Sequence, residues 1–217
     1  MRMRKKKHGA ERLAACGALL LTKPEAPLAD PAALIGREGG TYLEIGCGKG
    51  GFACGMAAAY PERNFIAMEK VSDVLVLAAE RAMREKDGRP DNLRFINGDA
   101  RDLAAWFAEG SLDGIYLNFS DPWPKAGHAK RRLTHRAFLT VYFSLLRPGG
   151  FLALKTDNEG LFAFTQEELA ALGATPTFLT DDLHASSEAA TNIMTEYERA
   201  FSEQGMKIHA LRVPALK

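Results

Sequence analysis

From Thr41 onward, short apolar runs alternate with amphipathic helical patterns, and this alternation constrains the fold more than any other sequence feature. The runs predict strands at 41–45, 64–68, 93–96, 112–119, 151–155, 176–179 and 196–201. Apolar residues at helical spacing, such as Val71, Val74, Leu75 and Ala78, predict helices between them. Such alternation is typical of an α/β fold with a mostly parallel sheet and helices on both faces. Because open parallel sheets bind ligands at their carboxyl edge, polar residues that follow the strands are the first candidates for a site.

Length and composition fit one main domain. A chain of 217 residues, 47% of them hydrophobic, can bury a sizeable core without disulfides or metals. We expect a basic leader with a short helix at 1–40 and a single domain at 41–217. The formal net charge of +1 does not itself indicate a polyanionic partner, so any such argument depends on local clusters.

The cysteines and the N-terminal segment bear on the compartment. Cys16, Cys47 and Cys54 form no paired spacing, which fits free thiols in a reducing compartment and predicts a cytoplasmic protein. A basic start followed by an apolar stretch at 13–21 loosely imitates a secretion signal. However, Glu11 and Arg12 interrupt the pattern, and the stretch is too short to span a membrane. We expect neither a membrane partner nor a metal site.

A glycine-rich loop follows the first expected strand. Gly46, Gly48 and Gly51 match the pattern G-x-G-x-x-G, in which glycines allow a tight turn and close approach of the backbone to a ligand. On its own this match is weak, because ordinary strand-to-helix turns also carry glycines. Both NAD and S-adenosylmethionine bind beside such loops in α/β proteins.

Three acidic residues at successive strand ends bear on the choice of cofactor, and of these Glu44 separates S-adenosylmethionine from NAD, whereas both cofactors need an acid at Glu69. Glu69 ends the second strand, where a carboxylate can accept both ribose hydroxyls of an adenosine. Glu44 lies just before the first glycine, where its charge suits an ammonium group and repels a pyrophosphate. Asp99 follows the third strand, where an adenine amino group would lie. The acids therefore predict S-adenosylmethionine as the cofactor.

The loop after the fourth strand reads Asp121-Pro122-Trp123-Pro124-Lys125. The two prolines fix φ and stiffen the loop, which suits a catalytic position. Trp123 can stack on a base or fill a gap against the next helix, and both interpretations stay open.

A basic run at 125–132 continues from this loop. It holds four lysines and arginines and no acidic residue, and it adjoins the expected cofactor pocket. Such a cluster is typical of a phosphate-binding surface, although many charge runs are only solvated faces. The basic residues at 2–7 also favour an RNA partner.

The 121–125 loop, His128 and the run Lys130-Arg131-Arg132-Leu133 together resemble the hallmark of the tRNA (guanine-N7)-methyltransferases. The motifs at 43–48, 155–158 and 195–198 extend the resemblance to roughly residues 40–202. The resemblance implies a Rossmann-like class I methyltransferase fold, whose seven-stranded sheet has an antiparallel last strand. It also implies methyl transfer from S-adenosylmethionine to N7 of a guanine in the variable loop of tRNA.

The resemblance also implies roles for individual residues. Asp121 would be the catalytic residue. The cofactor would be bound by Glu44, Gly46, Gly48, Glu69, Asp99 and Asp121; the target nucleotide by Lys125, Asp157, Thr195 and Glu198; and the RNA by Gly127, His128, Lys130, Arg131 and Arg132. Carboxylates at Asp157 and Glu198 suit a guanine, which offers N–H donors. The chain departs from the family at Ala126 and Gly127, where related enzymes carry basic residues, so the strength and choice of tRNA binding are open.

Three other functions compete with this one. An NAD-dependent oxidoreductase would explain the glycine pattern but not Glu44, and the sequence offers no evident hydride-transfer site. A non-catalytic RNA-binding module would not need the full set of acids. A methyltransferase for small molecules or proteins would have no use for the basic run. The sequence is compatible with a monomer or a homodimer.

Overall fold

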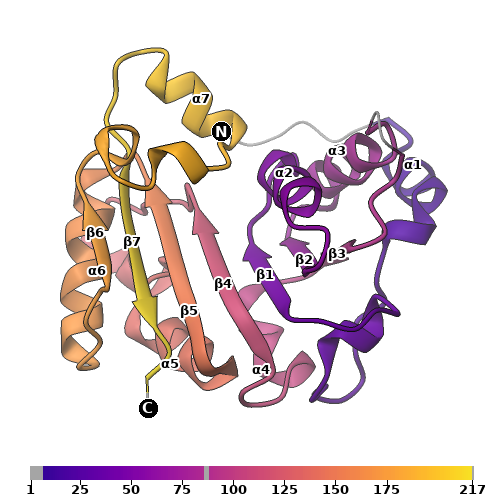
Figure 1. Cartoon of the computed structure of the whole chain (residues 1–217), viewed down its shortest axis with the longest axis horizontal. Coiled ribbons are helices and arrows are strands. Elements are labelled where there is room, and N and C mark those ends of the chain that lie inside the picture. The colour runs from indigo at the N-terminus through magenta and orange to yellow at the C-terminus, as the bar shows by residue number, and fades with distance from the viewer. Residues whose placement is uncertain (1–6, 86–87, 217) are drawn as a thin grey trace.

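The computed structural model describes residues 7–85 and 88–216 of the chain. A seven-stranded sheet forms the centre of this part, with helices on both faces (Figure 1). The strands are β1 (Thr41–Ile45), β2 (Asn64–Glu69), β3 (Leu93–Asn97), β4 (Leu112–Asn118), β5 (Leu146–Thr156), β6 (Phe178–Thr180) and β7 (His209–Pro214). Their order across the sheet is β3-β2-β1-β4-β5-β7-β6.

The direction of the strands confirms the expected fold class. β1 pairs in parallel with β2 and β4, and β4 pairs in parallel with β5. β7, the last strand in the chain, runs antiparallel to both of its neighbours, β5 and β6. The strand order reverses between β1 and β4, and the carboxyl ends of these two strands therefore form the switch point at which open α/β sheets bind ligands.

Alternating side chains of the strands face two layers of helices. Phe65 and Ala67 of β2 belong to one buried cluster with residues of α2 and α3, whereas Ile66 and Met68 belong to another with residues of α4, α5 and α6. The helices are α1 (Gly9–Ala15), α2 (Gly51–Ala59), α3 (Ser72–Ala82), α4 (Leu103–Trp106), α5 (Arg136–Leu145), α6 (Glu159–Ala171) and α7 (Glu196–Ser202). Short 3-10 helices are η1 (Gly17–Leu19), η2 (Pro31–Leu34), η3 (Ala100–Asp102), η4 (Ala126–Arg131), η5 (Leu183–Ala185) and η6 (Ala189–Thr191).

The expected strand at 196–201 is wrong, because this segment forms helix α7. A capping box starts the helix: Thr195 Oγ1 accepts a hydrogen bond from the backbone N–H of Glu198, and the Glu198 side chain accepts one from the backbone N–H of Thr195. The strand that fills the antiparallel position is β7, further along the chain. α7 lies above the carboxyl ends of β4 and β5 (Figure 1).

His135 caps α5, because its Nδ1 accepts a hydrogen bond from the backbone N–H of Ala137 at 3.1 Å. The helix ends at Leu145, and Pro148, Gly149 and Gly150 belong to the start of β5.

The segment before β1 packs on the domain. Arg12 of α1 forms a bidentate ion pair with Glu80 of α3, with contacts of 2.7 and 2.8 Å. Leu20 forms a β-bridge with Phe95 of β3. The three cysteines are buried free thiols, as expected. Within the described ranges, no helix is both long and apolar enough to cross a membrane.

Candidate active site

The loop between β1 and α2 has a shape that requires glycine. Gly46, Gly48 and Gly50 have φ values of 80°, 56° and 76°. At Gly50 an added Cβ would lie 2.8 Å from the Cβ of Ala78 in α3. The backbone N–H groups of Gly46 and Cys47 both donate to the carbonyl oxygen of Met68, at 2.8 and 2.9 Å, which fixes the loop beside β2. The loop therefore exposes a bare backbone edge at the switch point of the sheet.

Glu44 is buried beneath this loop with one oxygen unsatisfied. Asn118 Nδ2, from the end of β4, donates to Glu44 Oε1 at 2.9 Å. Glu44 Oε2 is buried and has no hydrogen-bond partner in the described part of the chain. Burial raises the pKa of Glu44 to about 7. An unsatisfied buried carboxyl oxygen suits a ligand that brings a positively charged donor, such as the ammonium group of an amino acid.

Glu69, at the end of β2, connects the glycine loop to the next helix. Its Oε2 accepts a hydrogen bond from the Gly48 N–H at 3.2 Å, and its Oε1 accepts one from Val71 N–H at 2.8 Å. Burial raises the pKa of this carboxyl group, and nearby Asp121 raises it further. Each carboxylate oxygen has a second lone pair, so both can still accept a ribose hydroxyl.

Asp99 lies at the end of β3, as expected, and is held by cations. Arg101 Nη2 lies 2.8 Å and Lys70 Nζ 2.7 Å from its Oδ2. The backbone N–H of Arg101 donates to Oδ1, so Asp99 also caps η3. These contacts lower the pKa of Asp99, and the side-chain hydrogen bond from Arg101 has the largest effect. The residue is thus ionised and fixed at the third strand end.

The loop after β4 is strained and held in place. Phe119 and Trp123 have φ values of 52° and 41°, which are uncommon for residues other than glycine and concentrate at functional sites. Arg132 donates from Nε to the carbonyl oxygen of Pro122 at 2.9 Å and from Nη2 to that of Trp123 at 3.1 Å. The structure therefore gives Arg132, expected to contact RNA, a contact within its own loop.

Asp121 is exposed at the start of this loop. No residue in the described ranges donates a hydrogen bond to its carboxylate, so it does not cap the following turn. Trp123, two residues later, contacts the basic run: Arg131 Cζ lies 5.0 Å from its ring centroid, and the His128 ring meets it edge-on at 5.6 Å. Trp123 thus anchors the start of the basic run while it stays half-buried.

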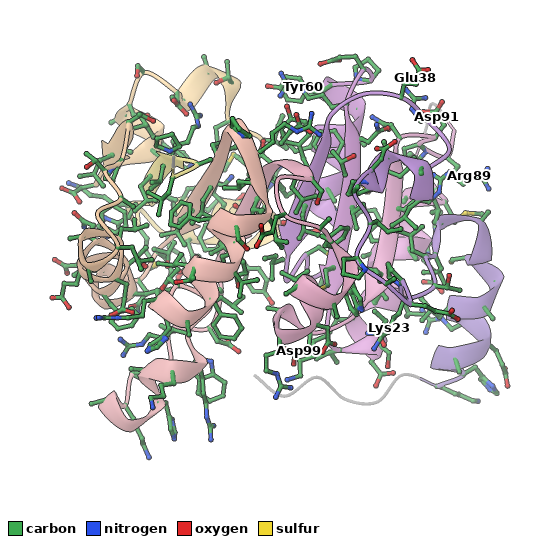
Figure 2. The ribbon with its side chains drawn as sticks, turned by 90° about the horizontal axis from the view of Figure 1, so that it is seen from below. Lys23, Glu38, Tyr60, Arg89, Asp91 and Asp99 are labelled. Carbon is green, nitrogen blue, oxygen red and sulfur yellow. The ribbon has the colours of Figure 1, made fainter. Side chains whose placement is uncertain are left out.

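The basic run forms η4, which projects from the body of the molecule as a short pink helix in Figure 2. Lys125, Lys130 and Arg131 are exposed. Gly127 is exposed as well, and an added Cβ there would have no heavy atom within 4 Å. The run therefore offers positive charge on a protruding surface, with room for a further side chain.

The residues expected to hold the target nucleotide fall into two groups. Lys125 is exposed and Asp157 half-buried near the carboxyl edge of the sheet. Thr195 and Glu198 are buried at the start of α7. Glu198 Oε1 accepts a hydrogen bond from Asn192 and lies 2.9 Å from His184 Nε2, so this carboxylate already has protein partners.

Two residues of the site, Lys155 and Asn118, were not predicted from the sequence. Lys155 Nζ donates to Glu198 Oε2 at 2.7 Å, to Asn192 Oδ1 at 2.9 Å and to the Ile193 carbonyl oxygen at 2.8 Å. Burial lowers the pKa of Lys155, and Glu198 opposes this effect. Both residues lie at strand ends beside the switch point, which is the signal that could have identified them. Asn118 orients Glu44, and Lys155 fixes the segment before α7.

Comparisons with known proteins agree with this arrangement. Residues 38–211 match the model of a protein family described as "Putative methyltransferase". The 16S rRNA methyltransferase KamB superposes with a TM-score of 0.64 at 14% identity, covering 89% of this chain and 96% of that one. A mutant of the 16S rRNA (adenine(1408)-N(1))-methyltransferase from Catenulisporales acidiphilia, with cosubstrate SAM, gives 0.54 at 19% identity, covering 98% and 93%. At such identities these structures show a shared fold, that of Rossmann-like class I methyltransferases.

Proposed function

Since the chain belongs to this family of methyltransferases, we propose that it transfers the methyl group of S-adenosylmethionine to N7 of a guanine in the variable loop of tRNA. Methyl transfer follows from the family, and the acids around the glycine loop fit this methyl donor. The tRNA and the guanine N7 rest on the resemblance of the 121–133 segment and on the site geometry. The three free thiols favour the cytoplasm as its compartment.

The observation that carries the proposal is the position of Asp121. It lies on a strained loop, held by Arg132, directly after β4 at the switch point. Its carboxylate has no hydrogen-bond donor among the described residues, yet it is close enough to Glu69 to raise the pKa of that group. An exposed carboxylate with no hydrogen-bond donor among the described residues, on a loop whose backbone Arg132 holds, is available to a reacting group.

Bound S-adenosylmethionine would supply an electrophilic methyl group on a sulfonium centre. Glu44 would pair with its ammonium group through the unsatisfied Oε2, and Glu69 would accept the ribose hydroxyls. Asp99, fixed by Lys70 and Arg101, would accept from the adenine amino group. The glycine loop leaves room for the backbone to approach the amino acid portion.

Guanine N7 carries a lone pair and no proton, so the reaction needs no general base. Positive charge develops on the purine as the methyl group arrives. Asp121 would stabilise that charge, and the stiff loop would keep the base in line with the methyl group.

Residues that follow β4 and β5, and residues at the start of α7, would hold the target base. We assign Asp157 to the guanine N–H donors and Lys125 to its oxygen or to a phosphate. Thr195 and Glu198 would complete the wall, with Glu198 exchanging its bond from Asn192 or His184 for one from the base. Gly127, His128, Lys130 and Arg131 would lie along the RNA backbone, with Arg132 holding the loop that presents them.

The proposal is tested by methyl transfer from labelled S-adenosylmethionine to three substrates in parallel: total tRNA, ribosomal RNA and bulk protein. We expect label in tRNA above the other two. Label in ribosomal RNA alone would assign this chain another RNA substrate and would refute the tRNA assignment.

A further inference from the structure

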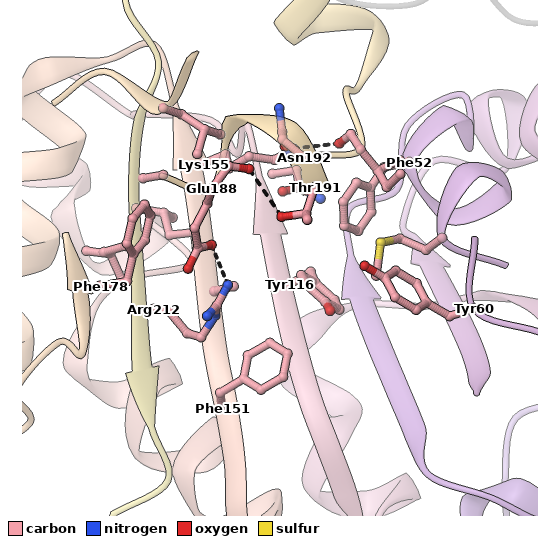
Figure 3. A pocket seen from close by; sticks show the side chains of 18 of the residues that line it. Phe52, Tyr60, Tyr116, Phe151, Lys155, Phe178, Glu188, Thr191, Asn192 and Arg212 are labelled. Atoms are coloured by element: carbon pink, nitrogen blue, oxygen red, sulfur yellow. Dashed lines mark hydrogen bonds and ion pairs between the residues drawn. The ribbon is translucent and has the colours of Figure 1, made fainter. Parts of the chain in front are cut away.

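A cavity of about 340 Å³ lies on the sheet face that carries α2, and no residue of the glycine loop at 46–51 lines it. Its floor is the side-chain layer of β4, β5 and β7, with Tyr116, Phe151 and Arg212. One wall is α2, and the other is the segment between β6 and α7 (Figure 3). The helices of this face pack on β2 and β3, which leaves the hollow over the other half of the sheet.

Aromatic rings line this cavity. Tyr116 meets Phe52 edge-on at 5.1 Å and Phe151 edge-on at 5.6 Å. Phe178 of β6 and Tyr60 at the end of α2 close it from opposite sides (Figure 3). Such a set of rings offers flat faces to a planar ligand.

Two guanidinium groups lie on the aromatic faces. Arg63 Cζ is 4.2 Å from the Tyr60 centroid, and Arg212 Cζ is 5.6 Å from that of Phe151. Arg212 is paired with Glu188, whereas Arg63 has, among the described residues, only the exposed Glu62 as an ion-pair partner. Lys155 also lies over Phe52, but its three N–H donors are already used within the protein.

The cavity adjoins the methyl-transfer site. Phe52 and Asn118 line both this cavity and the smaller one beside the glycine loop. Aromatic rings interleaved with arginines are how proteins bind unstacked bases of single-stranded RNA. A purely apolar partner would leave the Arg63 charge with only the exposed Glu62 as a counter-charge.

We propose that this cavity binds one unstacked base of the RNA substrate, a neighbour of the methylated nucleotide, with Arg63 meeting its phosphate. This assignment rests on the proposed function for the presence of RNA. The base stacks on the ring of Phe178, beside the Arg212 guanidinium, whose Cζ lies 5.9 Å from the Phe178 centroid and 5.6 Å from that of Phe151.

Neighbouring residues of β6 provide a matched pair of variants. Phe178 lines the cavity, while Leu179, the next residue, faces away and is 51% exposed. Phe178→Leu keeps apolar packing against Leu183 and Ile208 but removes the ring. Leu179→Ala removes a comparable apolar side chain outside the cavity, and melting temperatures check the fold of both.

The experiment measures the affinity of synthetic tRNA in which bases next to the methylated one are removed singly. Phe178→Leu should lower the affinity for intact RNA at least about fivefold, the low end for loss of a base–aromatic stack, and Leu179→Ala should leave this affinity unchanged. Removal of the base at one position should lower the affinity of the wild type by the same factor. The same removal should not lower the affinity of Phe178→Leu any further, because the base and the ring form a single contact that either change removes. Arg63→Gln should reduce the salt slope by about 1, and exposed Arg89→Gln should not.

Two results would overturn the proposal: equal affinity of wild type and Phe178→Leu, or additive losses at every abasic position. A third result would also overturn it: guanosine monophosphate binds the wild type but not Phe178→Leu, while every abasic RNA binds the wild type as tightly as intact RNA does. The cavity would then bind a free nucleotide and not a base of the RNA substrate. Methylation by the wild type is assayed in parallel. If the wild type binds tRNA but does not methylate it, only the proposed function is refuted. If methylation is normal but the losses of affinity are additive, only the role of the cavity in binding a base is refuted.

Discussion

At the scale of single residues, Glu44 combines burial with an oxygen that lacks a partner among the described residues. Its pKa of about 7 means that the carboxyl group is half neutral near physiological pH. Only the ionised form pairs with an ammonium group. We therefore predict that affinity for S-adenosylmethionine rises with pH through 7 and falls by up to about tenfold per pH unit below it. Calorimetry from about pH 5.5 to about 8.5 measures this.

Glu44→Gln is the control, because it keeps the bond from Asn118 but cannot titrate. Its affinity should be low and nearly constant with pH. The stability of the protein without cofactor should change in the opposite direction. A carboxyl group whose pKa is raised from 4.5 stabilises the fold fully below 4.5 and loses this contribution as the pH rises through about 7. A pH-independent affinity in wild type would contradict the assignment of Glu44.

Asp121→Asn separates charge from shape at the proposed catalytic position. We predict that single-turnover methylation slows by about tenfold to a thousandfold, the range for loss of one electrostatic contact. Because no described residue donates to this carboxylate, the melting temperature should stay unchanged. Rapid-quench methyl transfer at saturating tRNA and cofactor gives the rate. A wild-type rate in this variant would dismiss the electrostatic role of Asp121.

Single site residues were easier to predict from the sequence than their surroundings. Glu44, Glu69 and Asp99 could be located at strand ends, because that argument needs only the order of strands and polar residues. The burial of Glu44 and the contact from Lys155 to Glu198 could not be predicted. Such facts depend on contacts between distant residues, which are 74 positions apart for Glu44 and Asn118 and 43 apart for Lys155 and Glu198.

At the scale of elements, α7 shows why a short amphipathic segment is ambiguous. Tyr197 and Phe201 are four residues apart and stack at 6.4 Å, which is helical spacing. The strand predicted at 196–201 overlooks this helical spacing. The pattern Thr-x-x-Glu at 195–198 is a capping box and was visible in the sequence.

The departure at Gly127 in η4 gives a prediction about gain of binding. Its position is open, and its φ is not in the left-handed region, so a side chain fits. Gly127→Arg should tighten tRNA binding and steepen the dependence of log K on log salt by about 1, as one added phosphate contact would. Gly127→Gln, which lacks the charge, should leave the slope unchanged. Equal slopes in wild type and Gly127→Arg would mean that η4 lies away from the RNA.

At the scale of the whole molecule, a net charge of +1 coexists with a concentrated basic surface. If η4 meets phosphates, tRNA affinity should fall steeply with salt, and Lys130→Ala and Arg131→Ala should each reduce the slope by about 1. Cofactor affinity should barely respond, because burial shields Glu44 and Glu69 from the salt. Filter binding across a salt series measures the slope for tRNA, and calorimetry measures that for the cofactor. Unchanged slopes in both variants would make the run a solvated face.

The fold class followed from the sequence because alternating strands and helices admit few topologies. Right-handed crossovers and the carboxyl-edge rule then predict which edge of the sheet binds ligands. The 340 Å³ cavity was not predictable, since it depends on how the segment from β6 to α7 crosses the sheet. That path carries no periodic pattern in the sequence.

Identification of the methylated nucleoside tests the central claim most directly. tRNA is incubated with the wild-type protein and labelled S-adenosylmethionine, digested to nucleosides and separated by chromatography with mass detection. We predict that the label appears in 7-methylguanosine and that Asp121→Asn greatly reduces it. Label in a methylated adenosine, or in guanosine methylated at another atom, would contradict the account.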